Sequence, residues 1–501
     1  MSIRRVFPRL GGAVVIAFFG MSVPDTVAAQ ASQPDASAQQ HEHGKEPPPA
    51  TGTQTGHEGH TMPADQHAGH DMAAMESMGR EGSGTAWQPE STPMYAFHAN
   101  KAGWMLMAHE NAFVQFLRDS GDRGQDQFGS INWFMVMADR KVGTGHFGLR
   151  GMFSLEPWTI RGCGYPDLLA TGEQCNGQQI HDRQHPHDLF MELAAEYDAP
   201  IRGSMRWQVY GGPAGEPALG PVAYPHRLSA MPNPLAPISH HWLDATHITF
   251  GLVTAGVYTK RWKAEASVFN GREPDENRTN MDFGALDSVS GRLWFTPTSK
   301  WALQASVGRL NEVEPSATGG PGIDMTRATA SATYHRALRE NSIWATSIAW
   351  GRNAEPEHAT NALLVETNVT LDERDTWFGR FEVVGKTPHD LAVAVTADLF
   401  TVAKLQGGYT RYLNAWNGLK PGVGFSASAG AIPSALSSAY GGRVNFGFGI
   451  FVTVRPAVAR MANAPSASAP DTPGGPAAAP VEHDHSTTKP GVPSAPAPAK
   501  K

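Results

Sequence analysis

Long hydrophobic runs are missing from this sequence once its first 29 residues are passed. No later stretch approaches the ~20 consecutive apolar residues that a membrane-spanning helix needs. Charged residues are also scarce, at 17% of the chain, and the formal net charge is -7. Lys and Arg are scattered, so the sequence lacks a basic patch of the kind that binds nucleic acid. These absences exclude a helical membrane protein and a nucleic-acid partner.

The apolar run that does exist lies at the N-terminus. Arg4 and Arg5 precede an apolar stretch that ends at Val23, and small residues then lead to a cleavage site after Ala29. We interpret residues 1–29 as a signal peptide. The mature chain is therefore exported.

Cysteine is nearly absent as well. Cys163 and Cys175 are the two in the chain, and they lie close together in a stretch rich in Gly. Because an exported protein matures in an oxidising compartment, we expect them to form a disulfide that closes a short loop. A two-thiol metal site is the alternative.

Two segments have compositions that predict disorder. Residues 30–86 consist mainly of His, Met, Gly, Pro, Ala, Gln and Glu, and residues 456–501 are rich in Pro, Ala and Ser. Such segments bury too little apolar surface to offset the entropy of ordering them. The folded part is therefore expected over residues 87–455.

Within that part the hydrophobic pattern has a period of two. Between residues 363 and 371, Val365 and Val369 alternate with Glu366 and Asn368, and residues 260–269 alternate in the same way. Similar runs recur through the chain, and short polar segments such as 139–141 and 297–299 are expected to join them as antiparallel hairpins. Their lengths suit the ~9–11 residues of a tilted strand that crosses a bilayer.

We therefore predict an all-β fold, a transmembrane antiparallel β-barrel of about 16 strands, within a range of about 14–18. A soluble sandwich or propeller would alternate too. Two features favour the barrel. Trp and Tyr lie near many strand ends, as in interfacial girdles, with Trp133, Trp207, Trp294 and Trp301 among them. The aromatic, Gly-rich strand over residues 445–452 is typical of a closing barrel strand.

The segment after the signal peptide carries clustered metal-binding side chains. Imidazole suits Cu(II), Zn and Ni, whereas thioether sulfur is soft enough to select Cu(I). Mixing both on one segment favours copper over magnesium, calcium or manganese, with zinc or nickel as alternatives. The other interpretation is a solvated linker that is His-rich by chance, and the clustered methionines argue against it. The predicted metal ligands are His41, His43, His57, His60, Met62, His67, His70, Met72, Met75 and Met78.

This His/Met-rich tail ahead of an outer-membrane barrel resembles the copper resistance protein B family. The similarity covers the tail pattern, roughly residues 41–78, and the architecture. The resemblance implies a role in bacterial copper tolerance.

A second polar cluster lies within the barrel sequence. It comprises His181, His185, His187, Asp188, His226, His240 and His241, with His247 at the start of a strand. If the fold brings these residues together, they would form a metal site in the lumen or at its mouth, with carboxylates orienting the rings. The plainer interpretation is a hydrogen-bonded network or plug that lines the lumen. A hydrolase site built on His181, Asp182 and Asp188 is the weakest of the three.

The Pro- and Gly-rich segment 210–242 is too long for a simple turn. Its apolar and aromatic residues indicate order, and we predict that it folds into the lumen as a plug or gating loop.

Together these patterns predict a non-enzymatic outer-membrane protein that binds copper or a related soft metal. We expect both tails on the periplasmic side, membrane lipid and metal ions as partners, and a periplasmic copper oxidase or efflux system beside it. The alternative function is a general porin or solute channel whose His-rich tail is incidental.

Overall fold

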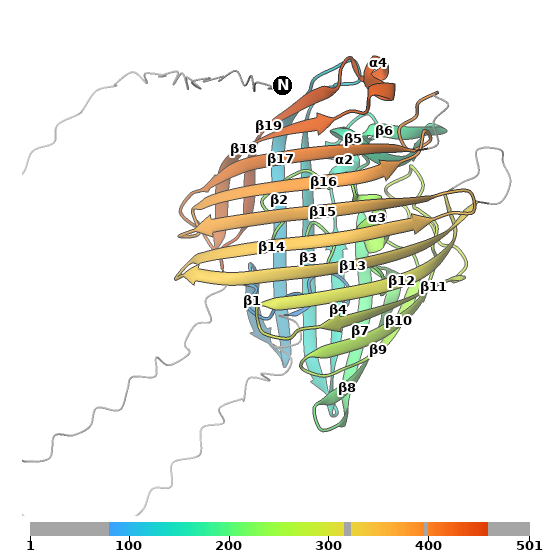
Figure 1. Cartoon of the computed structure of the whole chain (residues 1–501). Helices are drawn as coiled ribbons and strands as arrows, with labels where there is room; N and C mark the ends of the chain where they lie inside the picture. The colour runs from blue at the N-terminus through green and yellow to red at the C-terminus, as the bar shows by residue number, and fades with distance from the viewer. Residues whose placement is uncertain (1–79, 315–321, 395–398, 459–501) are drawn as a thin grey trace, which may run out of the picture. The chain divides into compact units, whose positions relative to one another are not determined.

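The computed structural model describes residues 80–314, 322–394 and 399–458, and these form a closed antiparallel β-barrel (Figure 1). The sheet contains 17 strands; β1 pairs with β2 alone, and the other sixteen complete the wall, which closes where β19 pairs with β2. The predicted all-β barrel of about 16 strands is confirmed. The wall strands are β2 (Trp104–Asp119), β3 (Asp126–Val142), β4 (Gly145–Phe153), β7 (Phe190–Arg202), β8 (Met205–Ala214), β9 (Leu252–Tyr258), β10 (Trp262–Phe269), β11 (Ser288–Phe295), β12 (Trp301–Glu314), β13 (Ile323–Arg339), β14 (Ser342–Ala354), β15 (Ala359–Leu371), β16 (Asp375–Lys386), β17 (Phe400–Tyr412), β18 (Leu419–Ala431) and β19 (Val444–Pro456).

Smaller elements lie between and beside the wall strands. They are β1 (Phe97–Lys101), α2 (Glu156–Thr159), the paired β5 (Tyr165–Cys175) and β6 (Gln178–Gln184), α3 (His240–Leu243), η1 (Ala245–His247), η2 (Ser434–Leu436) and α4 (Ser437–Tyr440). A disulfide joins Cys163 and Cys175 beside the β5–β6 hairpin, with 6.0 Å between their Cα atoms. No helix in the described ranges is long and apolar enough to span a membrane.

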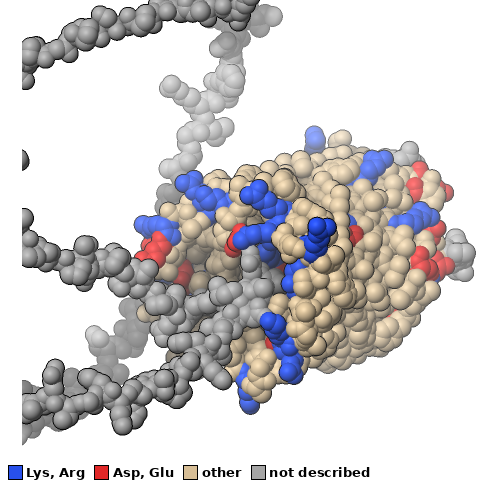
Figure 2. All heavy atoms as spheres, turned by 90° about the horizontal axis from the view of Figure 1, so that it is seen from below, with Lys and Arg blue, Asp and Glu red and all other residues tan. Residues whose placement is uncertain are grey.

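The wall strands carry their polar side chains inward. On β15, Glu366 and Asn368 are buried, whereas Leu363 is exposed. On β10, Lys263 and Glu265 are buried in the same way. A soluble protein instead buries apolar side chains and exposes polar ones. The reversed distribution follows from a wall with lipid outside and polar groups inside. Charged side chains accordingly gather toward the two ends of the barrel in Figure 2, and the wall between them carries few.

Aromatic side chains form a girdle at one end of the barrel. Trp301 packs against Tyr334 with ring centroids 4.7 Å apart, and Trp377 packs against Tyr409 at 5.3 Å. Interfacial aromatic girdles have this arrangement. The placement of Trp133 and Trp294 in the girdle was wrong, because both side chains are buried inside the barrel.

The two ends of the barrel differ in the length of their connections. At the girdle end the wall strands are joined by the short segments 143–144, 203–204, 259–261, 296–300, 340–341, 372–374 and 413–418. The opposite end carries the longer segments 154–189, 215–251, 270–287 and 387–399. The predicted turn at 139–141 was wrong, because β3 runs on through these residues and turns at 143–144. Both ends of the described chain approach the short-turn end, where Tyr95 bridges Val458.

The long connection 215–251 folds into the lumen, and we call it the lumen loop. Its residues are almost all buried, and it bonds to inward-facing side chains around the wall. Asn233 donates to Gln406 on β17 at 2.8 Å, and the Trp242 indole donates to Thr360 on β15 at 2.7 Å. Asn111 on β2 reaches the carbonyl of Met231 at 3.0 Å. The loop is thus held from several sides of the barrel.

Residues 80–96 also lie against the inner wall. Arg150 bonds both Glu81 and the carbonyl of Gly84, and Lys263 contacts the ring of Trp87 at 4.8 Å. The expectation of disorder up to residue 86 was therefore wrong for residues 80–86. Glu81 pairs with the inward-facing Arg150, a partner that the composition of this segment alone does not reveal. The signal peptide and residues 30–79 lie outside the described residues.

One arginine links the lumen loop to the wall through two buried carboxylates. Arg227 donates to Glu366 at 2.5 Å and to Asp244 at 3.0 Å. We expect Arg227→Met to cost about 3–5 kcal/mol, because it leaves buried negative charge short of a partner. The temperature at which the barrel loses its folded mobility in detergent electrophoresis would measure this loss. Arg309→Met is the matched control, since it removes an exposed pair with Asp324 worth about 0–1 kcal/mol. Equal shifts for both variants would contradict the anchoring role.

Candidate functional site

Five histidines meet inside the barrel, and we call them the lumen histidine cluster. The ring centroid of His240 lies 5.2 Å from that of His247 and 5.4 Å from that of His241. His187 lies 5.4 Å from His247, and His185 lies 5.7 Å from His241. All five side chains are buried. The fold therefore brings together five histidines of the polar cluster that the sequence analysis described, His247 among them.

Two separate parts of the chain supply these rings. His185 and His187 lie in the segment that leaves β6 and enters β7, where Pro186 favours an extended backbone. His240 and His241 lie on α3 and His247 ends η1, so three rings belong to the lumen loop. The cluster exists because the loop folds back onto the β6–β7 segment.

Acceptors hold the Nδ1 atom of most of these rings. His187 Nδ1 lies 2.9 Å from Glu156, His240 Nδ1 lies 2.9 Å from Asp244, and His241 Nδ1 lies 3.2 Å from Glu273. His247 Nδ1 lies 2.8 Å from the carbonyl of Asp244. A partner on one ring nitrogen fixes the tautomer and orients the other nitrogen, as it does behind metal-bound histidines.

The opposite ring nitrogens differ in what they contact. His187 Nε2 lies 3.1 Å from the hydroxyl of Tyr224. His241 Nε2 and His247 Nε2 are buried and have no hydrogen-bond partner within the ranges that the structure describes. A buried nitrogen without a partner carries a desolvation cost of about 1–3 kcal/mol, which a ligand would relieve.

The remaining predicted barrel residues lie outside this cluster. His181 is partly exposed and bonds Asp182 and Arg123 at 2.8 and 2.6 Å. Asp188 bonds Arg278 at 3.3 Å, beside the contact of His185 with Glu173 at 3.4 Å. Because His181 and Asp188 have different partners, the three residues of the hydrolase alternative do not form one constellation.

His226 belongs to another group of side chains. Its Nε2 lies 3.1 Å from the sulfur of Met152, and its ring packs on Trp133 with centroids 4.4 Å apart. The imidazole of His109 lies 5.8 Å away.

Burial controls the ionisation of the lumen loop. It lowers the pKa of His240 and drives the pKa of His247 well below its usual value. Burial alone would raise the pKa of Asp244, but Arg227 and the hydrogen bond from His240 outweigh it and hold that pKa below its ordinary range. The loop thus pairs neutral imidazoles with an ionised carboxylate. Neutral imidazole is the form that binds metal ions.

In the described ranges, no group of three or more His, Cys, Asp and Glu side chains is already arranged to hold a metal ion. The donor set nevertheless fits a borderline metal, since it offers imidazole nitrogens with carboxylates behind them. The ten predicted tail ligands, His41 to Met78, lie outside the described residues.

The sequence analysis expected carboxylates to orient the rings, and Asp244 lies four residues after His240. It did not identify Glu156 and Glu273, because each lies more than 30 residues along the chain from the histidine that it contacts. The prediction that His247 starts a strand was wrong, because it ends η1 and β9 begins at Leu252. Its spacing of seven residues from His240 gave no signal, because it meets the other rings through the turn at Asp244.

Comparison with known proteins gives distant matches to solved structures alone. No family model and no curated protein matches the chain, so the likeness of the tail to the copper resistance protein B family is not accompanied by a family match. OmpF of Salmonella typhi, in complex with daunomycin, is 12% identical over 72% of this chain and 100% of its own, with a TM-score of 0.44. An anion-selective porin from Comamonas acidovorans is 9% identical over 70% and 99%, with a TM-score of 0.44. OprB of Pseudomonas putida is 9% identical over 71% and 94%, with a TM-score of 0.43.

The buried imidazoles predict how stability depends on pH. The folded-state pKa of His247 is lowered, so the unfolded chain binds a proton below its ordinary pKa of about 6.5 while the folded chain does not. Stability is thus lost as pH falls below about 6.5, by about 1.4 kcal/mol per pH unit for this group. We expect the unfolding temperature, measured with a chelator present between pH 7 and 5, to fall less steeply in His247→Gln. Parallel pH profiles for the two proteins would contradict this.

Proposed function

We propose that this barrel handles copper, or a related soft metal, at the bacterial outer membrane, and that its lumen histidine cluster binds the ion in transit or in storage. The observation that supports this most directly is the pair of buried nitrogens on His241 and His247, on rings whose Nδ1 atoms are already held by acceptors. These two nitrogens belong to rings that lie in a group of five imidazoles, with acidic side chains behind the neighbouring rings.

The tail strengthens the choice of metal. Its imidazoles suit Cu(II), and its thioethers suit Cu(I), so one segment can follow copper through both oxidation states. We propose that His57, His60, Met62, His67, His70 and Met72 capture the ion. Zinc and nickel remain the alternative cargoes for the imidazoles.

The ends of the barrel suggest where capture happens. Outer-membrane barrels keep short turns on the periplasmic side and longer loops outside. The described chain begins with Arg80, which donates to the carbonyl of Lys260 in the short segment 259–261. We therefore propose that both tails lie in the periplasm, where a copper oxidase or an efflux system would be a natural partner.

A metal titration tests this proposal. The full-length protein in detergent is titrated with Cu(II) and Cu(I) in competition with a chelator. We expect several bound ions, most of them lost when the six capturing His and Met residues of the tail are replaced by Ala and Leu. We expect His241→Gln/His247→Gln to remove a further Cu(II) site, because Gln keeps the polarity and loses the imidazole nitrogen.

The matched control is His335→Gln. His335 is also buried, its Nδ1 lies 2.7 Å from Thr92, and its Nε2 lacks a hydrogen-bond partner among the described residues. It lies on β13 outside the cluster, so its replacement should leave metal binding unchanged. Affinity no tighter than that of a free His-rich peptide, unchanged in every variant, would end the proposal.

A solute channel is the second candidate, and the lumen loop favours it. A loop that folds into a barrel and bonds to its wall can narrow a passage and select what crosses it. This candidate expects conductance across a planar bilayer in the absence of metal, unchanged in His241→Gln/His247→Gln. The copper proposal instead expects conductance or ion release to depend on those side chains. The recordings therefore separate the two.

A further inference from the structure

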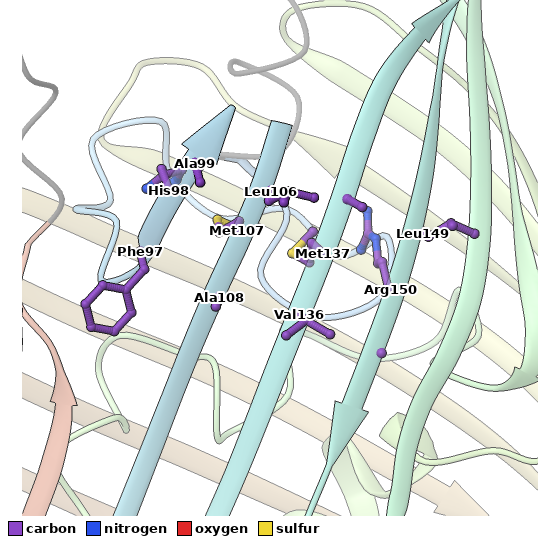
Figure 3. A pocket seen from close by; sticks show the side chains of 12 residues that line it. Phe97, His98, Ala99, Leu106, Met107, Ala108, Val136, Met137, Leu149 and Arg150 are labelled. Carbon is purple, nitrogen blue, oxygen red and sulfur yellow. The ribbon is translucent and has the colours of Figure 1, made fainter. Parts of the chain in front are cut away.

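Methionine side chains gather on the inner face of neighbouring wall strands. Met107, Met135, Met137, Met152 and Met191 are buried in one cluster, with Met94, Met105 and Met281 packed against it. They come from β2, β3, β4 and β7 and from segments beside them. Figure 3 shows Met107 and Met137 side by side on adjacent strands.

The strand register sets these side chains in rows across the wall. Met107 is paired with Met137. Two residues further along β2, at the next inward-facing position, His109 is paired with Met135. Met135 is in turn paired with Met152 on β4. One row therefore runs from an imidazole through two thioethers over three strands.

The lumen loop places a second imidazole on this row. His226 Nε2 lies 3.1 Å from the Met152 sulfur, and the ring lies 5.8 Å from that of His109. Trp133 closes the group, with centroid distances of 4.4 Å to His226 and 5.2 Å to His109. His109 Nε2 is buried and makes no hydrogen bond to any residue that the structure describes.

Methionine is an ordinary core filler, so packing alone could account for some of these residues. Packing does not account for the two imidazoles in the same group. The Nε2 of His226 contacts the sulfur of Met152, and the Nε2 of His109 is buried without a hydrogen-bond partner among the described residues. Leu or Phe at these positions would fill the space without that desolvation cost.

We infer that His109, Met135, Met152 and His226 form a second metal site, selective for a soft monovalent cation such as Cu(I). Thioether sulfur prefers Cu(I) to divalent ions, and imidazole binds it as well. The face of Trp133 can cover a desolvated cation through its π-electrons. We call this group the thioether site. It deepens the proposed function and rests on it, since it names the oxidation state of the cargo inside the wall.

Other thioethers lie between the site and the short-turn end. Met105 and Met107 lie near the start of β2, and Met137 pairs with Met107 near the 143–144 turn. An ion released at that end would meet these thioethers before the row at His109. Figure 3 draws the residues that line a hollow of about 570 Å³, which include Met107 and Met137 as well as exposed Val136 and Leu149. We do not include this hollow in the thioether site, because His109, Met135, Met152 and His226 do not line it.

Cu(I) and its redox-stable surrogate Ag(I) are the probes that test the thioether site. The full-length chain is used with its tail His and Met residues replaced, so that tail thioethers do not contribute. We expect one tightly bound Cu(I) with both nitrogen and sulfur neighbours in X-ray absorption spectra. Met135→Leu/Met152→Leu should remove this ion and its sulfur scattering, since Leu keeps nearly the same volume.

Met325→Leu is the matched control, because Met325 is equally buried on β13 in a different cluster. Unchanged Cu(I) binding in the double variant, or the same loss in the control, would overturn the inference. If the double variant does not fold, nitrogen-only scattering from Cu(I) in the tail-substituted parent would overturn it as well. Cu(II) binding that still depends on His241 and His247 would show that the proposed function survives this failure.

Discussion

A membrane-facing wall turns the polar side chains of a barrel inward, and each charge it places there needs a partner. In this protein the lumen loop meets that need. Arg227 on the loop joins Glu366 on the wall to Asp244 near the histidines, and Arg380 completes the pairing of Glu366. The Trp242 indole adds a neutral anchor on β15. The loop, the wall charges and the histidines are therefore parts of one network.

That network also determines the orientation of the imidazoles. Asp244 accepts from Arg227 through one oxygen and contacts His240 through the other, while its carbonyl lies next to His247 Nδ1. The contacts that hold the loop therefore also select which ring nitrogens remain available. The proposed metal site and the stability of the loop share these residues, so a substitution at Asp244 would disturb both. Variants at His241 or His247 separate them better, since these rings leave a nitrogen unused.

The lumen offers two chemistries rather than one. The histidine cluster presents nitrogen with carboxylates behind it, which suits borderline divalent ions. The thioether site around Met135 and Met152 presents sulfur and suits monovalent copper. The same lumen loop contributes to both groups, with His240 on α3 in the first and His226 in the second. The proposed handling of copper in two oxidation states would use both donor types.

The sequence by itself determined the strands, their antiparallel pairing and the approximate size of the barrel, because a period of two is a local property of the chain. It could not decide which Trp side chains face lipid: Trp133 and Trp294 lie on strands as expected, but on the inner face. It also could not place His247 beside His187 or set Met135 opposite His109, since those contacts depend on loop closure and strand register. Local pattern fixes alternation along a strand, whereas contacts between distant segments exist only once the barrel has closed and its charges have found partners.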